Sequence, residues 1–301
     1  MASMNAAWMM VLASLLFATM SVCVKLAATQ YGAGEVVFYR GLVGAVAIVA
    51  LVRARGGTLR TPAPGMHVGR SAAGVIAMCL WFHALGGLPL ATATTLNYMS
   101  SVWMALFLIG GSIMFGARRV EGLLVAAVLL GFAGVALVLR PSLEAAQFWH
   151  ALSGLMSGVL AALAYLQITA LGRAGEPEER TVFYFNLGSL VIGGALMAWQ
   201  GMGTHTLRGV ALLLAIGVLA VMAQMLMTRA YTVGSTLVNA VLQYLGILFA
   251  FAYGVLLFGE ALTAPAVLGV VLIVAAGLMT SRVRARAPEP EDTRGRYPGN
   301  G

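Results

Sequence analysis

Arg40 is the residue whose chemistry stands out first in this sequence. It lies in "GEVVFYRGLVG" (34–44), at the start of an apolar run that continues to Val52, in a chain of which only 9% is charged. Across a membrane, an arginine near the bilayer centre costs about 2.5–3.5 kcal/mol. A guanidinium also binds carboxylates and phosphates through paired, charge-assisted hydrogen bonds. Arg40 is therefore a candidate for binding an anionic group.

Polar side chains recur at helical spacing in other apolar segments. Thr94, Asn97 and Ser101 follow an i, i+3, i+7 pattern, and Asn239 and Gln243 continue an i, i+4, i+8 pattern that starts at Ser235. A polar group in hydrocarbon needs a partner or water, so such stripes indicate a cavity or an interhelical bond. The predicted pathway residues are Lys25, Tyr39, Arg40, Trp81, His83, Asn97, Tyr98, Ser101, Gln167, Gln224, Asn239, Gln243 and Tyr244.

Each of these residues also has a simpler explanation. A single polar residue can serve an interhelical hydrogen bond, and His83 can be a packing histidine. Arg40 lies roughly 7–8 Å from the outer end of its segment at the standard helical rise, so it can snorkel to the surface. We favour a substrate path, in which Arg40, with Lys25 as a second candidate, attracts a carboxylate or phosphate. Glu35 is the nearby acid that can partly neutralise one of them.

The elements that must position these residues are long apolar segments. The chain has 301 residues and is 60% hydrophobic, and a segment of about 20 apolar residues crosses a bilayer. We therefore predict an all-α integral membrane protein. The ten predicted spans are about 6–28, 35–52, 69–86, 90–115, 119–139, 151–171, 181–199, 208–230, 235–258 and 264–281.

The basic residues are distributed unevenly between the two sides of these spans. With the amino terminus in the cytoplasm, 14 of the 18 lysines and arginines, Arg70 among them, fall on the cytoplasmic side, and two, Arg140 and Arg208, fall outside. This bias follows the positive-inside rule and places both termini in the cytoplasm. The net charge of +8 is thus a matter of topology, and we expect no nucleic-acid partner. Cys23 and Cys79 both lie within spans, which excludes a disulfide framework.

The two halves of the chain resemble each other. Residues 90–116 align without a gap on residues 233–259, and "VFYR" (37–40) matches "VFYF" (182–185) at an offset of 145. Each half has five predicted spans, and an odd number inverts the second half relative to the first. Inverted repeats of this kind enclose a substrate site near the membrane midplane in many secondary transporters. We expect repeats at 1–140 and 150–281, followed by a disordered tail at 282–301.

These features resemble the drug/metabolite transporter superfamily, specifically its EamA-type members. The resemblance rests on ten spans in two repeats, the aromatic-Arg element of the second span, and "LLFGEALT" (256–263), and it covers about residues 6–281. The usual Gly-Glu after the ninth helix is present as Gly259-Glu260, whereas the first repeat has Gly116-Ala117. The usual proline early in helices four and nine is missing. The resemblance implies a central cavity, a rocking mechanism and a bacterial inner-membrane location.

The acids of the sequence bear on how transport is driven. Glu35, Glu121 and Glu260 sit at span edges and no acid lies inside a span, so we expect a facilitator, an exchanger or coupling through His83 instead of a carboxylate relay. A cationic cavity also argues against export of cationic drugs.

We predict a secondary transporter of a small anionic or zwitterionic metabolite, with an amino acid or derivative favoured. Alternatives are an importer of a vitamin or nucleoside-type metabolite, an intramembrane enzyme and a structural membrane protein. The enzyme is disfavoured because no nucleophile–base or metal motif occurs, and no nucleotide-binding loop, cofactor or metal site is expected. The expected partners are the substrate and the bilayer. The substrate, its direction, a coupling ion and the oligomeric state stay open, a homodimer included.

Overall fold

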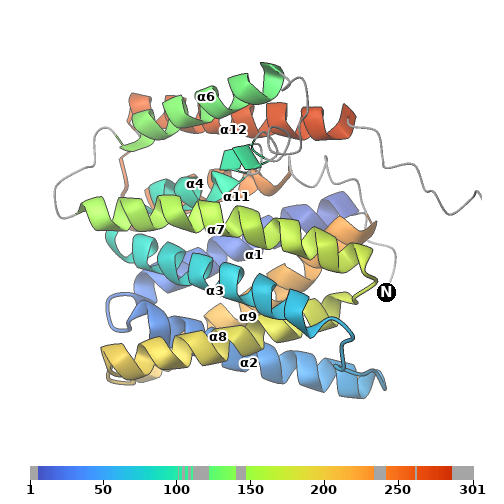
Figure 1. Cartoon of the computed structure of the whole chain (residues 1–301). Coiled ribbons are helices and arrows are strands. Elements are labelled where there is room, and N and C mark those ends of the chain that lie inside the picture. Colours follow the sequence, from blue (N-terminus) through green and yellow to red (C-terminus); the bar gives the residue numbers. More distant parts are fainter. Residues whose placement is uncertain are drawn as a thin grey trace, which may run out of the picture.

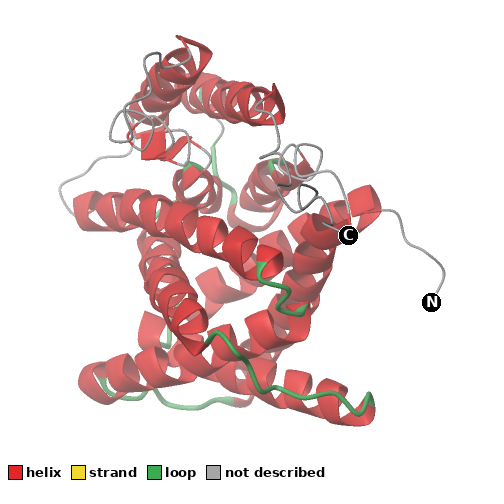
Figure 2. Cartoon of the chain, turned by 45° about the vertical axis from the view of Figure 1, so that its right-hand side comes forward, coloured by secondary structure: helices red, strands yellow, loops and turns green. Residues whose placement is uncertain are grey.

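The computed structural model describes residues 6–100, 102–103, 106–107, 110, 122–139, 147–233, 242–261 and 263–286. In this part of the chain all regular structure is helical, with short connecting loops, as Figure 2 shows. The helices are α1 (Ala6–Ala27), α2 (Ala33–Ala54), α3 (Pro64–Gly87), α4 (Leu90–Tyr98), α6 (Gly122–Leu139), α7 (Phe148–Arg173), α8 (Glu178–Gln200), α9 (Leu207–Val233), α11 (Leu245–Phe258) and α12 (Ala264–Arg286).

The described helices form a bundle suited to lipid. Six of them are long and apolar enough to cross a membrane: α1, α2, α3, α7, α8 and α9; shorter apolar helices are Leu245–Phe258 and Ala264–Ala276. Large apolar side chains, among them Val46, Leu129, Val191 and Leu256, are more than 60% exposed on the outside of the bundle. The helices run side by side between two loop-bearing ends, with α6 and α12 packed on each other at one edge (Figure 1). The protein is an all-helical membrane protein.

Helices α2 and α8 pack closely on each other at the edge of the bundle opposite α6 and α12 (Figure 1). A Cβ atom added at Gly34 would lie 2.6 Å from Leu196 Cβ, and one at Gly41 would lie 2.7 Å from Ser189 Cβ. As residue numbers rise along α2 they fall along α8, so the two helices are antiparallel. Small residues at an interface let helix backbones approach closely in a membrane.

The fourth and ninth predicted spans are interrupted, where the sequence predicted continuous helices at 90–115 and 235–258. Helix α4 ends at Tyr98 with a turn at Met99, and α11 begins at Leu245 after a turn at Tyr244. The two turns are separated by the same 145 positions that relate "VFYR" to "VFYF". At the start of α4, the Glu260 carboxylate accepts hydrogen bonds of 2.8 and 3.0 Å from the Leu90 N–H, which satisfies a donor that a helix start leaves unpaired.

Several helix ends differ from the sequence prediction, and those of α3, α7 and α12 bear on the placement of titratable residues. Helix α3 begins at Pro64, not near residue 69, because the fixed φ angle of proline suits the first position of a helix. Helix α7 begins at Phe148, not near 151. His67 and His150 therefore lie in membrane helices together with His83. Helix α12 continues to Arg286, past the predicted end of its span at residue 281, and residues 287–301 lie outside the described part.

Candidate substrate cavity

A cavity opens among α1, α2, α3, α4, α7, α8 and α9, and about 580 Å³ of space there, part of it open to solvent, is not filled by atoms. Most of its lining is apolar or aromatic, with a few polar side chains between, as is usual for small-molecule sites. Its polar lining residues among the described ones are Arg40, Arg70, Asn97, Tyr165 and Gln224, and its aromatic side chains also include Phe17, Trp81 and Phe185.

Arg40 reaches this cavity from α2. It is 3% exposed, and its Nη2 donates a 3.2 Å hydrogen bond to Oε1 of Gln224 on α9. Its Nε and Nη1 atoms have no hydrogen-bond partner among the described residues. The guanidinium carbon lies 5.1 Å from the centroid of the Phe185 ring. The side chain thus points inward and does not snorkel, and much of its donor capacity is unused.

Arg70 reaches the same cavity from α3 and was missed by the sequence reasoning. It is 5% exposed, its guanidinium carbon lies 3.9 Å from the centroid of the Phe185 ring, and its Nε and Nη1 atoms also have no hydrogen-bond partner among the described residues. Grouping it with the cytoplasmic basic residues was wrong, because α3 begins earlier than predicted and carries Arg70 more than one turn inside. Gly74 leaves the space for it: a Cβ there would lie 2.7 Å from Arg70 Nη1 and 2.9 Å from a Phe185 ring carbon.

Two buried guanidiniums share the Phe185 ring, and no carboxylate in the described part of the chain forms an ion pair with either of them. The ion pairs of the described residues involve Lys25, Arg55, Arg180 and two histidines, and neither Arg40 nor Arg70. Cation–π contact recovers about 0.5–2 kcal/mol for each guanidinium. That is less than the cost of placing a charge in the bilayer interior. An anion entering the cavity would supply the missing compensation.

Three further predicted pathway residues lie at the cavity. Trp81, Asn97 and Gln224 all line it. Asn97 donates a 3.1 Å hydrogen bond to Ser157, so it also joins α4 to α7. Gln243 donates a 3.2 Å hydrogen bond to the hydroxyl of Tyr165, a lining residue.

Lys25 and Tyr39 lie away from the cavity lining. Lys25 Nζ is 3.3 Å from Oε1 of Glu260, and it donates to the Leu88 carbonyl oxygen, so its charge is matched. The Tyr39 ring packs edge-on against His205, with 5.6 Å between the ring centroids. The structure therefore pairs Arg40 with Arg70 in the cavity, and not with Lys25.

The remaining predicted residues are distributed more widely. His83 is exposed and stacks on His150, with ring centroids 4.3 Å apart. Gln167 lies beside Gly69, and the Tyr98 and Tyr244 rings are 6.4 Å apart outside the lining. Ser101 and Asn239 lie outside the described residues.

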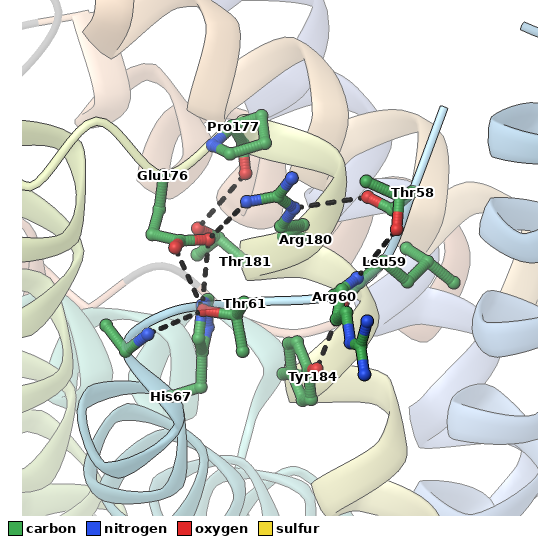
Figure 3. Close-up of polar contacts among 11 residues, drawn as sticks. Thr58, Leu59, Arg60, Thr61, His67, Glu176, Pro177, Arg180, Thr181 and Tyr184 are labelled. Carbon is green, nitrogen blue, oxygen red and sulfur yellow. Dashed lines mark hydrogen bonds and ion pairs between the residues drawn. The ribbon is translucent and has the colours of Figure 1, made fainter. Parts of the chain in front are cut away.

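A buried carboxylate ties two loops together at one end of the bundle (Figure 3). Glu176 accepts a 2.9 Å hydrogen bond from Thr61 and lies 3.2 Å from His67 Nε2 and 3.5 Å from Arg180 Nη1. Burial raises the pKa of Glu176, but the hydrogen bonds from Thr61 and His67 and the charge of Arg180 outweigh it, and the net pKa lies below the ordinary value. Arg180 also donates to the Thr58 carbonyl oxygen. We call Thr58, Thr61, His67, Glu176 and Arg180 the Glu176 cluster.

The other end of the bundle is tied by a second buried acid. Glu35 is 1% exposed and accepts a 3.0 Å hydrogen bond from the Gly203 N–H. His205 Nε2 lies 3.1 Å from its other oxygen. The connections α1–α2 and α8–α9 are joined here, as α2–α3 and α7–α8 are joined by the Glu176 cluster.

Known proteins match the chain along most of its length. The model of the EamA-like transporter family matches it twice, at residues 4–140 and 148–282. The pseudopaline exporter CntI of Pseudomonas aeruginosa is 33% identical over 274 residues, which cover 91% of this chain and 95% of that protein. A riboflavin transporter of Rhizobium johnstonii is 28% identical, covering 76% and 74% of the two chains, and an S-adenosylmethionine uptake transporter of Rickettsia bellii is 23% identical, covering 84% and 85%.

A solved crystal structure shares the fold. It aligns with a TM-score of 0.66 at 17% identity and covers 93% of this chain and 98% of the other. The family matches cover both halves and reach every helix described above, and the three relatives named above are transporters, not enzymes. The chain belongs to the EamA-like transporter family.

Proposed function

We propose that this protein is a secondary transporter that moves a small organic metabolite with an anionic or zwitterionic group, an amino acid or derivative being favoured. Transport proceeds by alternating access between two inverted five-helix repeats, at 1–140 and 150–281, with ten spans in all. The protein lies in the bacterial inner membrane with both termini in the cytoplasm. The observation that carries the proposal is the burial of Arg40 in the central cavity with unused donors.

The packing of the helices supports the repeat. The helices of the two halves correspond in five pairs: α1 with α7, α2 with α8, α3 with α9, α4 with α11 and α6 with α12. When each helix is replaced by its counterpart, every main packing pair becomes either itself or another main packing pair. The pairs α2–α8 and α6–α12 map onto themselves, and α3–α7 maps onto α1–α9. Together with the antiparallel course of α2 and α8 and the two family-model matches, this pattern is what an inverted repeat requires.

The charge of the cavity supports an anionic substrate and outward transport. A negative inside potential drives anions out of the cell, by about 2.3 kcal/mol per charge at 100 mV. This force needs no carboxylate relay, which agrees with the absence of acids from the predicted span interiors. The 33% identical relative is an exporter. We therefore propose export as the direction.

Uptake of a vitamin or nucleoside-type metabolite is the second candidate. It is favoured by the similarity to a riboflavin transporter and to an S-adenosylmethionine uptake transporter. Both candidates share the cavity and the repeats, and they differ in the direction of net movement and in the charge of the substrate.

Release from loaded vesicles tests the proposal. Purified protein is reconstituted into liposomes filled with a mixture of metabolites, and the contents are measured by mass spectrometry after a potential is applied. We expect loss of one or a few anionic or zwitterionic compounds with wild type, and no loss with Arg40→Gln.

Arg55→Gln is the matched control, because Arg55 lies at the surface and pairs with Glu179. It should release the same compounds as wild type. Equal release by Arg40→Gln would contradict the role of Arg40, and release of only neutral or cationic compounds would contradict the proposed substrate class.

A further inference from the structure

We propose that the cavity recognises two negative charges on one substrate, either a pair of carboxylates or a single phosphoryl group, through Arg40 and Arg70 together. This inference rests on the proposed function and specifies its substrate class. The shared chemistry is a set of anionic oxygens carrying two charges, held between two guanidiniums.

The position of Arg70 is the first step of the argument. Arg40 and Arg70 come from different helices, yet their guanidinium carbons lie 5.1 and 3.9 Å from the centroid of the same Phe185 ring. Both side chains line the one cavity. A single small molecule can therefore reach both cations.

Their unused donors are the second step. A structural arginine normally spends its five N–H groups on carbonyl oxygens or carboxylates. Here Nε and Nη1 of both Arg40 and Arg70 have no hydrogen-bond partner among the described residues. In that part of the chain Arg40 makes one side-chain hydrogen bond, to Gln224. This donor set matches the bidentate recognition that carboxylates and phosphates receive.

Charge balance is the third step. Two like charges in a low-dielectric cavity repel each other, and each disfavours the charged form of the other. A substrate with one negative charge would leave a buried cation unmatched, whereas a dianion neutralises the pair. Lys25, another basic residue within a predicted span, already has Glu260 as its acid.

Pairs of probes that differ by one charge test the inference. Binding to the purified full chain is measured for glutarate against its monoamide, and for glycerol 3-phosphate against dimethyl phosphate. The first pair tests two carboxylates and the second a phosphoryl group. We expect one dianion or both to bind wild type about tenfold or more tightly than the singly charged partner.

Variants assign this preference to the two arginines. Arg70→Gln should reduce the preference to near one while weak binding of the singly charged probe persists, and Arg70→Lys should restore part of it. Arg55→Gln should keep the wild-type preference. A single sharp elution peak checks folding, and should Arg70→Gln fail to fold, the wild-type and Arg70→Lys ratios decide the question.

The outcomes separate the two proposals. Equal binding of both members of each pair to wild type, or an unchanged preference in folded Arg70→Gln, would overturn the two-charge inference; singly charged binding that depends on Arg40 would leave the proposed function standing. Failure of every anionic probe to bind wild type would count against both.

Discussion

Arg40 and Arg70 show what single residues reveal in a membrane sequence. Arg40 could be marked as a candidate site residue from the sequence, because an arginine deep in an apolar run is not placed there to contact water. Arg70 could not, since it follows a loop rich in arginine and its inward direction depends on where α3 begins. The partners of Lys25 were hidden for a similar reason: Glu260 is 235 positions away in sequence and becomes a neighbour only through folding.

Gly74 is predicted to control the position of the Arg70 guanidinium. In Gly74→Ala the new methyl group would displace Arg70 Nη1, the end of a flexible side chain, and would also push on a Phe185 ring carbon at 2.9 Å. Both are side-chain atoms, so the fold should persist with the Arg70 guanidinium and the Phe185 ring shifted. We expect the affinity for an anionic ligand to fall about fivefold or more, as measured by ligand titration of the purified protein.

Gly65→Ala on the same helix is the control, because a Cβ there meets no atom within 4 Å. It should leave the affinity unchanged. Wild-type affinity in Gly74→Ala would show that Arg70 does not need its present position.

At the scale of elements, sequence periodicity and hydropathy predicted every described helix, but not the breaks in two of them. The turns at Met99 and Tyr244 carry no proline or glycine, so no local signal marks them. They lie where the fourth and ninth spans meet each other, with the Tyr98 and Tyr244 rings 6.4 Å apart, a contact that the sequence alone does not show. Interrupted helices line the substrate site in many transporters.

The α2–α8 contact should be destabilised by a methyl group added at Gly193 but tolerate one added at the neighbouring Gly194. In Gly193→Ala the Cβ would lie 2.6 Å from the Phe38 backbone nitrogen and 3.0 Å from the Gly34 carbonyl oxygen, and neither can move alone. We expect a loss of about 1–3 kcal/mol in the free energy of unfolding, seen as a lower melting temperature in detergent.

Its neighbour Gly194 provides the comparison. There the added methyl group would approach only a Phe38 ring carbon, at 3.3 Å, and the ring can shift. Gly194→Ala should therefore melt close to wild type. Equal losses in both variants would argue against a close backbone contact at Gly193.

The Glu176 cluster predicts a pH dependence of stability. Because the folded state lowers the pKa of Glu176 below the ordinary 4.5, the unfolded chain binds a proton more readily, and stability rises with pH through this window. The contribution is present above about pH 4.5 and is lost as pH falls through the folded pKa.

Melting curves of wild type and Glu176→Gln from pH 3 to pH 8, taken in about one-unit steps, test this prediction. Wild type should be the more stable near neutral pH, and the difference should shrink below about pH 4.5. A difference that stays constant down to pH 3 would mean that folding does not lower the pKa of the Glu176 carboxyl group.

At the scale of the whole molecule, we propose that two similar halves rock about a cationic cavity. The buried acids Glu35 and Glu176 tie loops at opposite ends of the bundle, and each tie joins a connection from the first half to one from the second. In the proposed alternating access the two ends would open in turn, and these ties would be the contacts that opening must break. The proposed repeat rests in part on the sequence alone, whereas the ties needed the structure, because hydrogen bonds between loops leave no periodic pattern.

The most direct measurement of the central claim is a ligand-stabilisation screen of purified protein against a metabolite library, with Arg40→Gln in parallel. A ligand at 100 times its dissociation constant stabilises the folded state by about 2.7 kcal/mol. The proposed function predicts that the stabilising compounds carry a carboxylate or phosphate and that they do not stabilise Arg40→Gln. Stabilisation by neutral or cationic compounds, or equal stabilisation of Arg40→Gln, would contradict it.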